Sequence, residues 1–141
     1  MSDSVFTVKF HGVRGSIPSP LGSEEVEEKL TRALAKAKPE DLTDEDSIKS
    51  FVQTLPHEER GTFGGNSSCV SVQVDDELLI FDAGSGIRML GQELMATEFG
   101  RGQGKAQIFF SHTHWDHILG IPFFVPFYIK GNQFNHPQSV A

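Results

Sequence analysis

The segment 111–117 is dense in side chains that can do chemistry. It holds three of the six histidines of the protein together with one carboxylate, Asp116. Neutral imidazoles and carboxylates are the usual protein ligands of zinc and similar divalent ions. Residues two apart in an extended segment point to the same side, so we expect His112, His114 and Asp116 to face one way together. The segment therefore predicts a site for one metal ion, or for two neighbouring ions.

The end of this segment decides whether His117 joins the other donors. If a helical turn begins at Trp115 or Asp116, His117 swings toward the same cavity. The alternative is a solvated loop in which Asp116 caps a helix, because aspartate is a favoured N-cap residue. That alternative accounts for Asp116 alone and not for three neighbouring histidines, so we favour the metal site.

A buried strand is expected to position these donors. The apolar run 108–110 leads directly into the segment, and a short continuous apolar run is typical of a buried strand. The strand should therefore end near Ser111. Its carboxyl end then carries the polar loop, which is where open α/β sheets tend to bind ligands.

The pattern His-x-His-x-Asp-His after an apolar strand resembles the signature of the metallo-β-lactamase superfamily. Three glycine-containing segments also resemble the branch with ribonuclease Z-like and cyclic-nucleotide phosphodiesterase-like proteins: 12–18, 64–69 and 81–86. The resemblance covers nearly all of the chain except about residues 21–60. It implies an α/β fold, namely the N-terminal half of an αββα sandwich, with a mixed β-sheet and flanking helices. Residues 1–141 would form a partial domain of this fold, and 21–60 a helical insertion in it.

The resemblance also implies roles for individual residues. His112 and His114 would bind one ion, and Asp116 and His117 would bind a second. Asp116 would also handle a proton, as its counterpart does in phosphodiesterases of the family. Asp82, at the end of another apolar strand, would orient the metal ligands without being one, although a turn former or cap is its alternative role. The implied cofactor is a pair of divalent ions, zinc first, with manganese or iron as alternatives.

The substrate that the resemblance implies is a phosphodiester, either a cyclic nucleotide or RNA. Cleavage of a β-lactam is disfavoured because the glycine segments resemble the phosphodiesterase branch. Arg14 is the candidate contact for a substrate phosphate, since arginine pairs well with phosphate oxygens. A surface salt bridge is the other interpretation of Arg14.

The ligand set that the family requires extends beyond His117. The family adds a later histidine, a bridging aspartate and a final histidine, whereas only His136 lies downstream here, and we do not expect it to substitute. A second subunit or a missing C-terminal half is therefore the expected partner that completes the site. The alternative function is a non-catalytic fragment or pseudo-enzyme with an incomplete metal site.

Composition and charge narrow the other possibilities. The 141 residues fit one domain, and no apolar run approaches the ~20 residues that cross a bilayer. The net charge of −7 argues against a wide non-specific nucleic-acid surface. Most of this charge belongs to 21–60, where eleven acidic and six basic side chains give −5.

The only cysteine, Cys69, excludes an internal disulfide and fits the reducing cytoplasm in which we expect the protein. Cys69 begins a predicted strand, and buried cysteines are usually inert, so a catalytic thiol is not expected. Met1–Ser4 lacks the basic start of a signal peptide.

Periodicity predicts the remaining elements. Alternation indicates half-buried strands at 5–10 and 70–74, the second paired in a hairpin with 78–81. Helices are expected at 23–38 with Ser23 as N-cap, after Thr43 up to Leu55 with Thr43 as the capping residue, and from Ile87 toward Gly100.

Two further expectations follow from these elements. The helical pair within 21–60 is either a lid over the cleft or a peripheral hairpin, and we favour the hairpin. The tail 131–141 lacks periodicity and is expected to fray. A half-sandwich would also leave one face of its sheet uncovered, with apolar side chains facing water.

Overall fold

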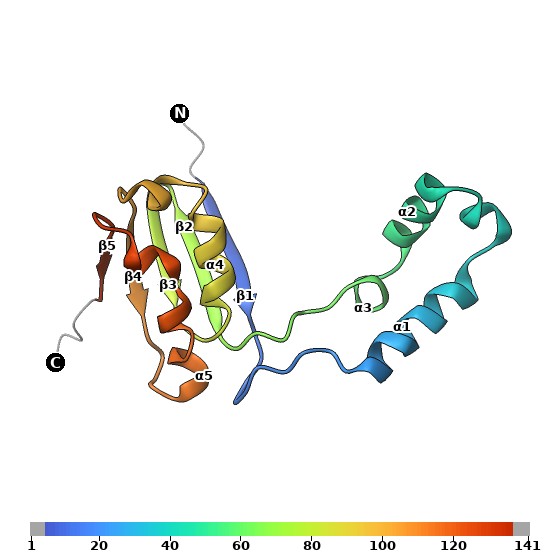
Figure 1. Ribbon diagram of the computed structural model, residues 1–141, viewed down its shortest axis with the longest axis horizontal. Helices are drawn as coiled ribbons and strands as arrows, with labels where there is room; N and C mark the ends of the chain where they lie inside the picture. Colours follow the sequence, from blue (N-terminus) through green and yellow to red (C-terminus); the bar gives the residue numbers. More distant parts are fainter. Residues whose placement is uncertain (1–4, 137–141) are drawn as a thin grey trace. The chain divides into compact units, whose positions relative to one another are not determined.

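The computed structural model describes residues 5–136 of the chain. The expectations for Met1–Ser4 and for the tail residues 137–141 lie outside the described residues. The chain divides into two compact units, whose described residues are 5–19 with 65–136 and 20–64. Figure 1 shows the elements of each unit. None of the helices within 5–136 has the length and the apolar character needed to cross a membrane.

The first unit is built on a five-stranded sheet in the order β1-β2-β3-β4-β5 (Figure 1). Its strands are β1 (Phe6–Gly12), β2 (Cys69–Val74), β3 (Glu77–Phe81), β4 (Lys105–Phe109) and β5 (Gln133–Asn135). β2 is antiparallel to both β1 and β3, whereas β4 is parallel to both β3 and β5. The mixed sheet with its flanking helices confirms the predicted α/β class.

One face of this sheet is covered by α4 (Ile87–Leu94). Lys9 of β1 forms an ion pair with Glu93 of α4 at 2.6 Å, which identifies the covered face. The core on this face is apolar and contains Cys69, Leu78, Ile80, Ala83, Ile87, Leu90, Phe99, Ala106, Ile108 and Phe124. The helix predicted to run toward Gly100 ends at Leu94, and a separate 3-10 turn, η2 (Glu98–Arg101), follows it.

The strand register places the alternating apolar residues on the opposite face. Phe10 lies opposite Val70, which in turn lies opposite Phe81. Phe10 is 68% exposed and Phe6 on the same side 70%, whereas Cys69 on the other face is fully buried. Alternation therefore identified the strands, but the apolar side of β1 and β2 is the open side. This open apolar face agrees with the expectation for a half-sandwich.

The last strand corrects the expectation that the whole tail frays. Residues 133–135 pair in parallel with β4, and the Gln133 N–H donates to the Gly104 carbonyl at 2.9 Å. Phe134 packs against the core. A strand of three residues is too short to show a period of two, so the pattern gave no sign of it.

The second unit, residues 20–64, is helical. It contains α1 (Ser23–Lys36), η1 (Pro39–Leu42), α2 (Glu45–Thr54) and α3 (His57–Arg60). Both predicted N-caps are wrong by one residue: Gly22 caps α1, and the Asp44 carboxylate caps α2 by accepting the Ser47 N–H at 2.8 Å. Aspartate caps a helix at least as well as threonine, so neighbouring candidates compete. That this unit is an insertion stays a prediction.

Candidate metal centre

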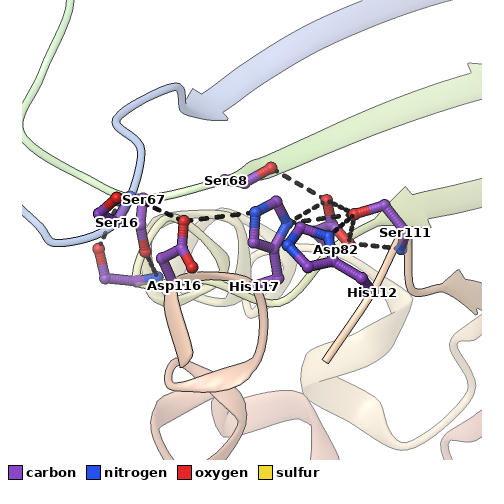
Figure 2. Close-up of polar contacts among 9 residues, drawn as sticks. Ser16, Ser67, Ser68, Asp82, Ser111, His112, Asp116 and His117 are labelled. Atoms are coloured by element: carbon purple, nitrogen blue, oxygen red, sulfur yellow. Dashed lines mark hydrogen bonds and ion pairs between the residues drawn. The ribbon is translucent and has the colours of Figure 1, made fainter. Parts of the chain in front are cut away.

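The predicted donors come together where two parallel strands end. β3 and β4 run side by side in the same direction, so their carboxyl ends lie at the same edge of the sheet. Asp82 follows β3 directly, and Ser111 follows β4 after one residue. The chain then turns into a short helix, α5 (Trp115–Ile118). Figure 2 shows the cluster that results.

Asp82 is the centre of a hydrogen-bond network (Figure 2). Its buried carboxylate accepts the Ser111 N–H at 2.8 Å, the Ser111 hydroxyl at 2.9 Å and the Ser68 hydroxyl at 3.1 Å. Burial raises the pKa of the Asp82 carboxyl, but the hydrogen bonds from Ser111, His117 and Ser68 outweigh it and hold the pKa below its ordinary value. Asp82 is therefore ionised at neutral pH and acts as a fixed acceptor.

The contact with Asp82 selects the tautomer of His117. His117 Nδ1 lies 2.7 Å from Asp82 Oδ2. An ionised carboxylate can only accept, so Nδ1 carries the proton and donates it. Nε2 of a neutral His117 then keeps its lone pair, which is the form of histidine that binds metals. The geometry gives Asp82 an orienting contact with His117, and the metal role of both residues stays a prediction.

The other two histidines lie beside His117. The ring centroid of His112 is 4.0 Å from that of His117 and 4.5 Å from that of His114. His112 Nδ1 also lies 3.1 Å from the Ser111 hydroxyl. Ser111 therefore links Asp82 to the first histidine of the segment.

Asp116 is a buried carboxylate, with 8% of its surface exposed. It is the second residue of α5, and His114 occupies the N-cap position, so the interpretation of Asp116 as a helix cap is wrong. Its Oδ2 accepts the Ser16 N–H at 2.8 Å and lies 3.3 Å from His117 Nε2. Burial raises the pKa of Asp116, but the N–H donors, together with His117 and His112 when these are protonated, outweigh it and hold the pKa below its ordinary value.

The types of donor in this cluster fit zinc, which binds imidazole nitrogens and carboxylate oxygens. Their arrangement is incomplete: among residues 5–136, no three His, Cys, Asp or Glu side chains form a group that could hold a metal ion as they stand. The donors are instead drawn together in pairs, as the distances around His112 and His117 show. Metal binding would therefore need side-chain rotations, or further ligands from outside the described residues.

The other candidate residues have different surroundings. Arg14 lies on the exposed turn after β1, where it forms a β-bridge with Ser67. His136 contacts the Ile108 carbonyl at 3.0 Å and packs edge-on against Phe110. Burial raises the pKa of the Cys69 thiol to about 12, which excludes a thiolate nucleophile near neutral pH.

Glycine allows the loops to meet beneath the cluster. A Cβ on Gly84 would lie 2.2 Å from the Asp116 carbonyl oxygen, and one on Gly12 would lie 2.0 Å from the Ser67 carbonyl oxygen. Not even a methyl group fits at either position. The glycine segment 81–86 therefore packs directly against residues 111–117, the donor segment, and the segment 12–18 packs directly against 64–69. Sequence reasoning missed three serines that bond to the carboxylates of the cluster, Ser16, Ser68 and Ser111. Their only signal was a neighbouring glycine for Ser16, the start of β2 for Ser68 and the end of β4 for Ser111.

Comparison with known proteins shows which family the segment around this cluster resembles. Residues 62–130 match the family model of the metallo-beta-lactamase superfamily. The match covers just under half of the chain, so it is a similarity of this segment to the superfamily. The matched segment contains Asp82 and the whole His/Asp segment, so the resemblance inferred from the motif is confirmed. Members of the superfamily generally bind divalent metal ions, often zinc.

Curated relatives of this superfamily segment are ribonuclease Z proteins. Ribonuclease Z of Methanosarcina mazei is 44% identical over 57 residues, which are 40% of this chain and 17% of the relative. Ribonuclease Z of Methanosarcina acetivorans is 40% identical over 57 residues with the same shares. Ribonuclease Z of Haloferax volcanii is 42% identical over 55 residues, or 39% of this chain and 16% of the relative. The matches thus span about a sixth of the relatives' length, and no solved structure matches significantly.

Proposed function

We propose that this chain supplies part of the site of a metal-dependent hydrolase that cleaves phosphodiesters. The observation that carries the proposal is the Asp82–His117 contact, which directs a metal-binding nitrogen toward Asp116 beside His112. The superfamily match supports a hydrolytic metal site. The relatives are named ribonuclease Z, so RNA is the substrate class that we favour over a cyclic nucleotide.

Each residue of the cluster has a distinct task in this proposal. His112 and His114 would hold one ion, and Asp116 and His117 the other. Bound ions of this kind lower the pKa of a water molecule and polarise a phosphoryl oxygen. Asp82 keeps His117 in the tautomer with a free Nε2 lone pair. Asp116, kept ionised by its N–H donors, accepts a proton during hydrolysis.

Substrate binding and the rest of the ligand set lie beyond this cluster. Arg14 is the proposed contact for the substrate phosphate, because a guanidinium can donate two parallel hydrogen bonds to it. Because residues 5–136 contain no complete donor group as they stand, the proposal includes further ligands from elsewhere. A second subunit or another chain segment would provide them.

The same incomplete donor group favours a second candidate function. A chain whose donors reach one another only in pairs would bind metal weakly and would act as a non-catalytic or pseudo-enzyme module. Native mass spectrometry with zinc or manganese separates the two candidates. Ions retained by each chain or each dimer support the hydrolase, whereas no retained ion supports the non-catalytic module.

Asp116→Ala tests the hydrolase directly. We expect turnover of bis(p-nitrophenyl) phosphate by the zinc-loaded protein to fall about 100-fold or more, because the variant removes both a ligand and a proton acceptor. Asp76→Ala, on the turn at the opposite end of β3, is the matched control and should keep its turnover. Unchanged turnover in Asp116→Ala would contradict the assignment.

A further inference from the structure

Ser16 has a backbone conformation that few residues other than glycine adopt. Its φ is 64°, and only Asp75 and Asp82 share a positive φ among the non-glycine residues in 5–136. The Ile17 N–H donates to the Gly15 carbonyl at 2.9 Å, which closes a three-residue γ-turn centred on Ser16. A γ-turn with a positive central φ is rare and strained. Such a conformation persists only where the surroundings hold it.

The result of this conformation is a contact with the metal-site segment. The Ser16 N–H donates to Asp116 Oδ2 at 2.8 Å, across 100 residues of sequence. The same carboxylate oxygen lies 3.3 Å from His117 Nε2. The strained turn therefore directs a backbone donor at a buried carboxylate beside a candidate metal-binding nitrogen (Figure 2).

The turn is held from both sides by one neighbouring segment. The N–H groups of Val13 and Arg14 donate to the Asn66 carbonyl at 3.0 and 2.9 Å, and the Ser19 N–H donates to the Gly65 carbonyl at 2.8 Å. These bonds fix the chain before and after Ser16 to residues 65–66. We call this set of backbone hydrogen bonds the frame. It sets the position of the Ser16 N–H, which therefore does not depend on Ser16 alone.

The frame continues to the donor segment. Ser67 and Ser85 exchange two hydrogen bonds, each hydroxyl accepting the other's N–H at 3.0 and 2.9 Å. The Ala83 N–H donates to the His117 carbonyl at 2.7 Å. The Ser16 turn and α5 are therefore two ends of one bonded frame, and the distance between them is fixed.

We propose that Ser16 is a positioning residue whose backbone N–H holds Asp116 Oδ2 in place beside His117 Nε2, so that the carboxylate is oriented for metal binding. A carboxylate has several lone pairs on its two oxygens, so it can be held by one N–H and still bind an ion. The side chain of Ser16 is dispensable in this role, and its left-handed backbone is essential. The metal part of this inference rests on the proposed function.

Substitutions at residue 16 separate backbone from side chain. Ser16→Gly keeps the N–H and adopts a positive φ without strain, so its zinc affinity, measured by chelator competition, should stay within about 3-fold of wild type. Ser16→Val keeps the N–H but disfavours a positive φ. We expect its zinc affinity to fall about 10-fold or more, as for other partners of metal ligands.

Asp75→Val is the matched control, because it places the same β-branched side chain at another positive φ, in the β2–β3 turn. It should lower thermal stability but leave zinc affinity unchanged. Wild-type affinity in Ser16→Val, or a loss in Ser16→Gly as large as that in Ser16→Val, would overturn the proposal.

Hydrogen exchange in the metal-free protein tests the contact independently of metal. The residue 16 amide, followed by NMR, should be protected in wild type and should exchange at least about 10-fold faster in Asp116→Ala. An unprotected amide in wild type would overturn the contact. A protected amide in a protein that binds no zinc would support the contact, while overturning the metal role of Ser16 together with the proposed function.

Discussion

One face of the five-stranded sheet buries polar side chains, whereas the other face exposes apolar ones. On the face covered by α4, Ser71 and His11 are buried and form a hydrogen bond of 2.8 Å. On the open face, Phe6 and Phe10 are mostly exposed, and Phe81 stacks on Phe109 at 5.1 Å. The side of β1 and β2 that looks more like core by composition is thus the exposed one.

This difference teaches that burial is decided by what lies next to a strand. Burial of apolar surface stabilises a fold only where another element covers that surface. α4 follows β3 in the chain and covers the face carrying Ile80 and Ile108. The open face keeps its apolar side chains although water reaches them, and such contiguous apolar patches commonly mark interaction surfaces.

Ile80→Ala, on the covered face, should produce the largest loss of stability. Ile80 is fully buried, so we expect the free energy of unfolding to fall by about 2–5 kcal/mol, from lost burial and the cavity left behind. Val72→Ala, on the open face, should cost less than about 1 kcal/mol. Urea titrations monitored by circular dichroism measure both losses. Equal losses would contradict the conclusion that only one face of the sheet is covered.

Raising the pH should cause a smaller loss of stability, through ionisation of the Cys69 thiol in the unfolded chain. Burial raises its pKa in the folded protein from 9.0 to about 12, so the unfolded chain loses the thiol proton first as the pH rises. The stabilising contribution is complete below pH 9 and declines as the pH rises toward 12. By pH 10 the loss should be about 1 kcal/mol.

Cys69→Ala is the control for this titration, since its unfolding free energy lacks the thiol contribution. The two proteins should therefore diverge between pH 8 and pH 10. Parallel stability profiles would show that the covered face admits solvent to the thiol.

Phe10→Ser, on the open face, should have the smallest effect on stability. Phe10 is 68% exposed, so the unfolding free energy should change by no more than about 0.5 kcal/mol. Binding of the dye anilinonaphthalene sulfonate, which reports apolar surface, should decrease. A large loss of stability would mean that this face is covered in solution.

The donor segment was predictable because its information is local. His112, His114, Asp116 and His117 lie within six residues, and an apolar strand precedes them. Their convergence needed only the end of one strand and the start of one helix. The α/β class was predictable for the same reason, since the spacing of apolar residues along the sequence indicates strands and helices.

The supporting contacts were not predictable because they join distant parts of the chain. Ser16 and Asp116 are separated by 100 residues, and Ser111 and Asp82 by 29. The proposed role of Asp82 came from family resemblance, whereas no pattern in the sequence pointed to the Ser16 N–H. The prediction of the N-cap of α2 was wrong for another reason, because Thr43 and Asp44 are both good capping residues and lie one residue apart.

The hydrogen bond between the Ser19 N–H and the Gly65 carbonyl has a consequence for how such a chain can change over generations. It brings together, within the first unit, the two points between which residues 20–64 leave and return. A loop whose ends already meet can be lengthened, shortened or replaced without moving them, and its closure entropy rises only slowly with length. This junction should therefore tolerate insertion and deletion. One lineage can gain a helical segment here and another can lose it, while the sheet and the donor segment stay unchanged.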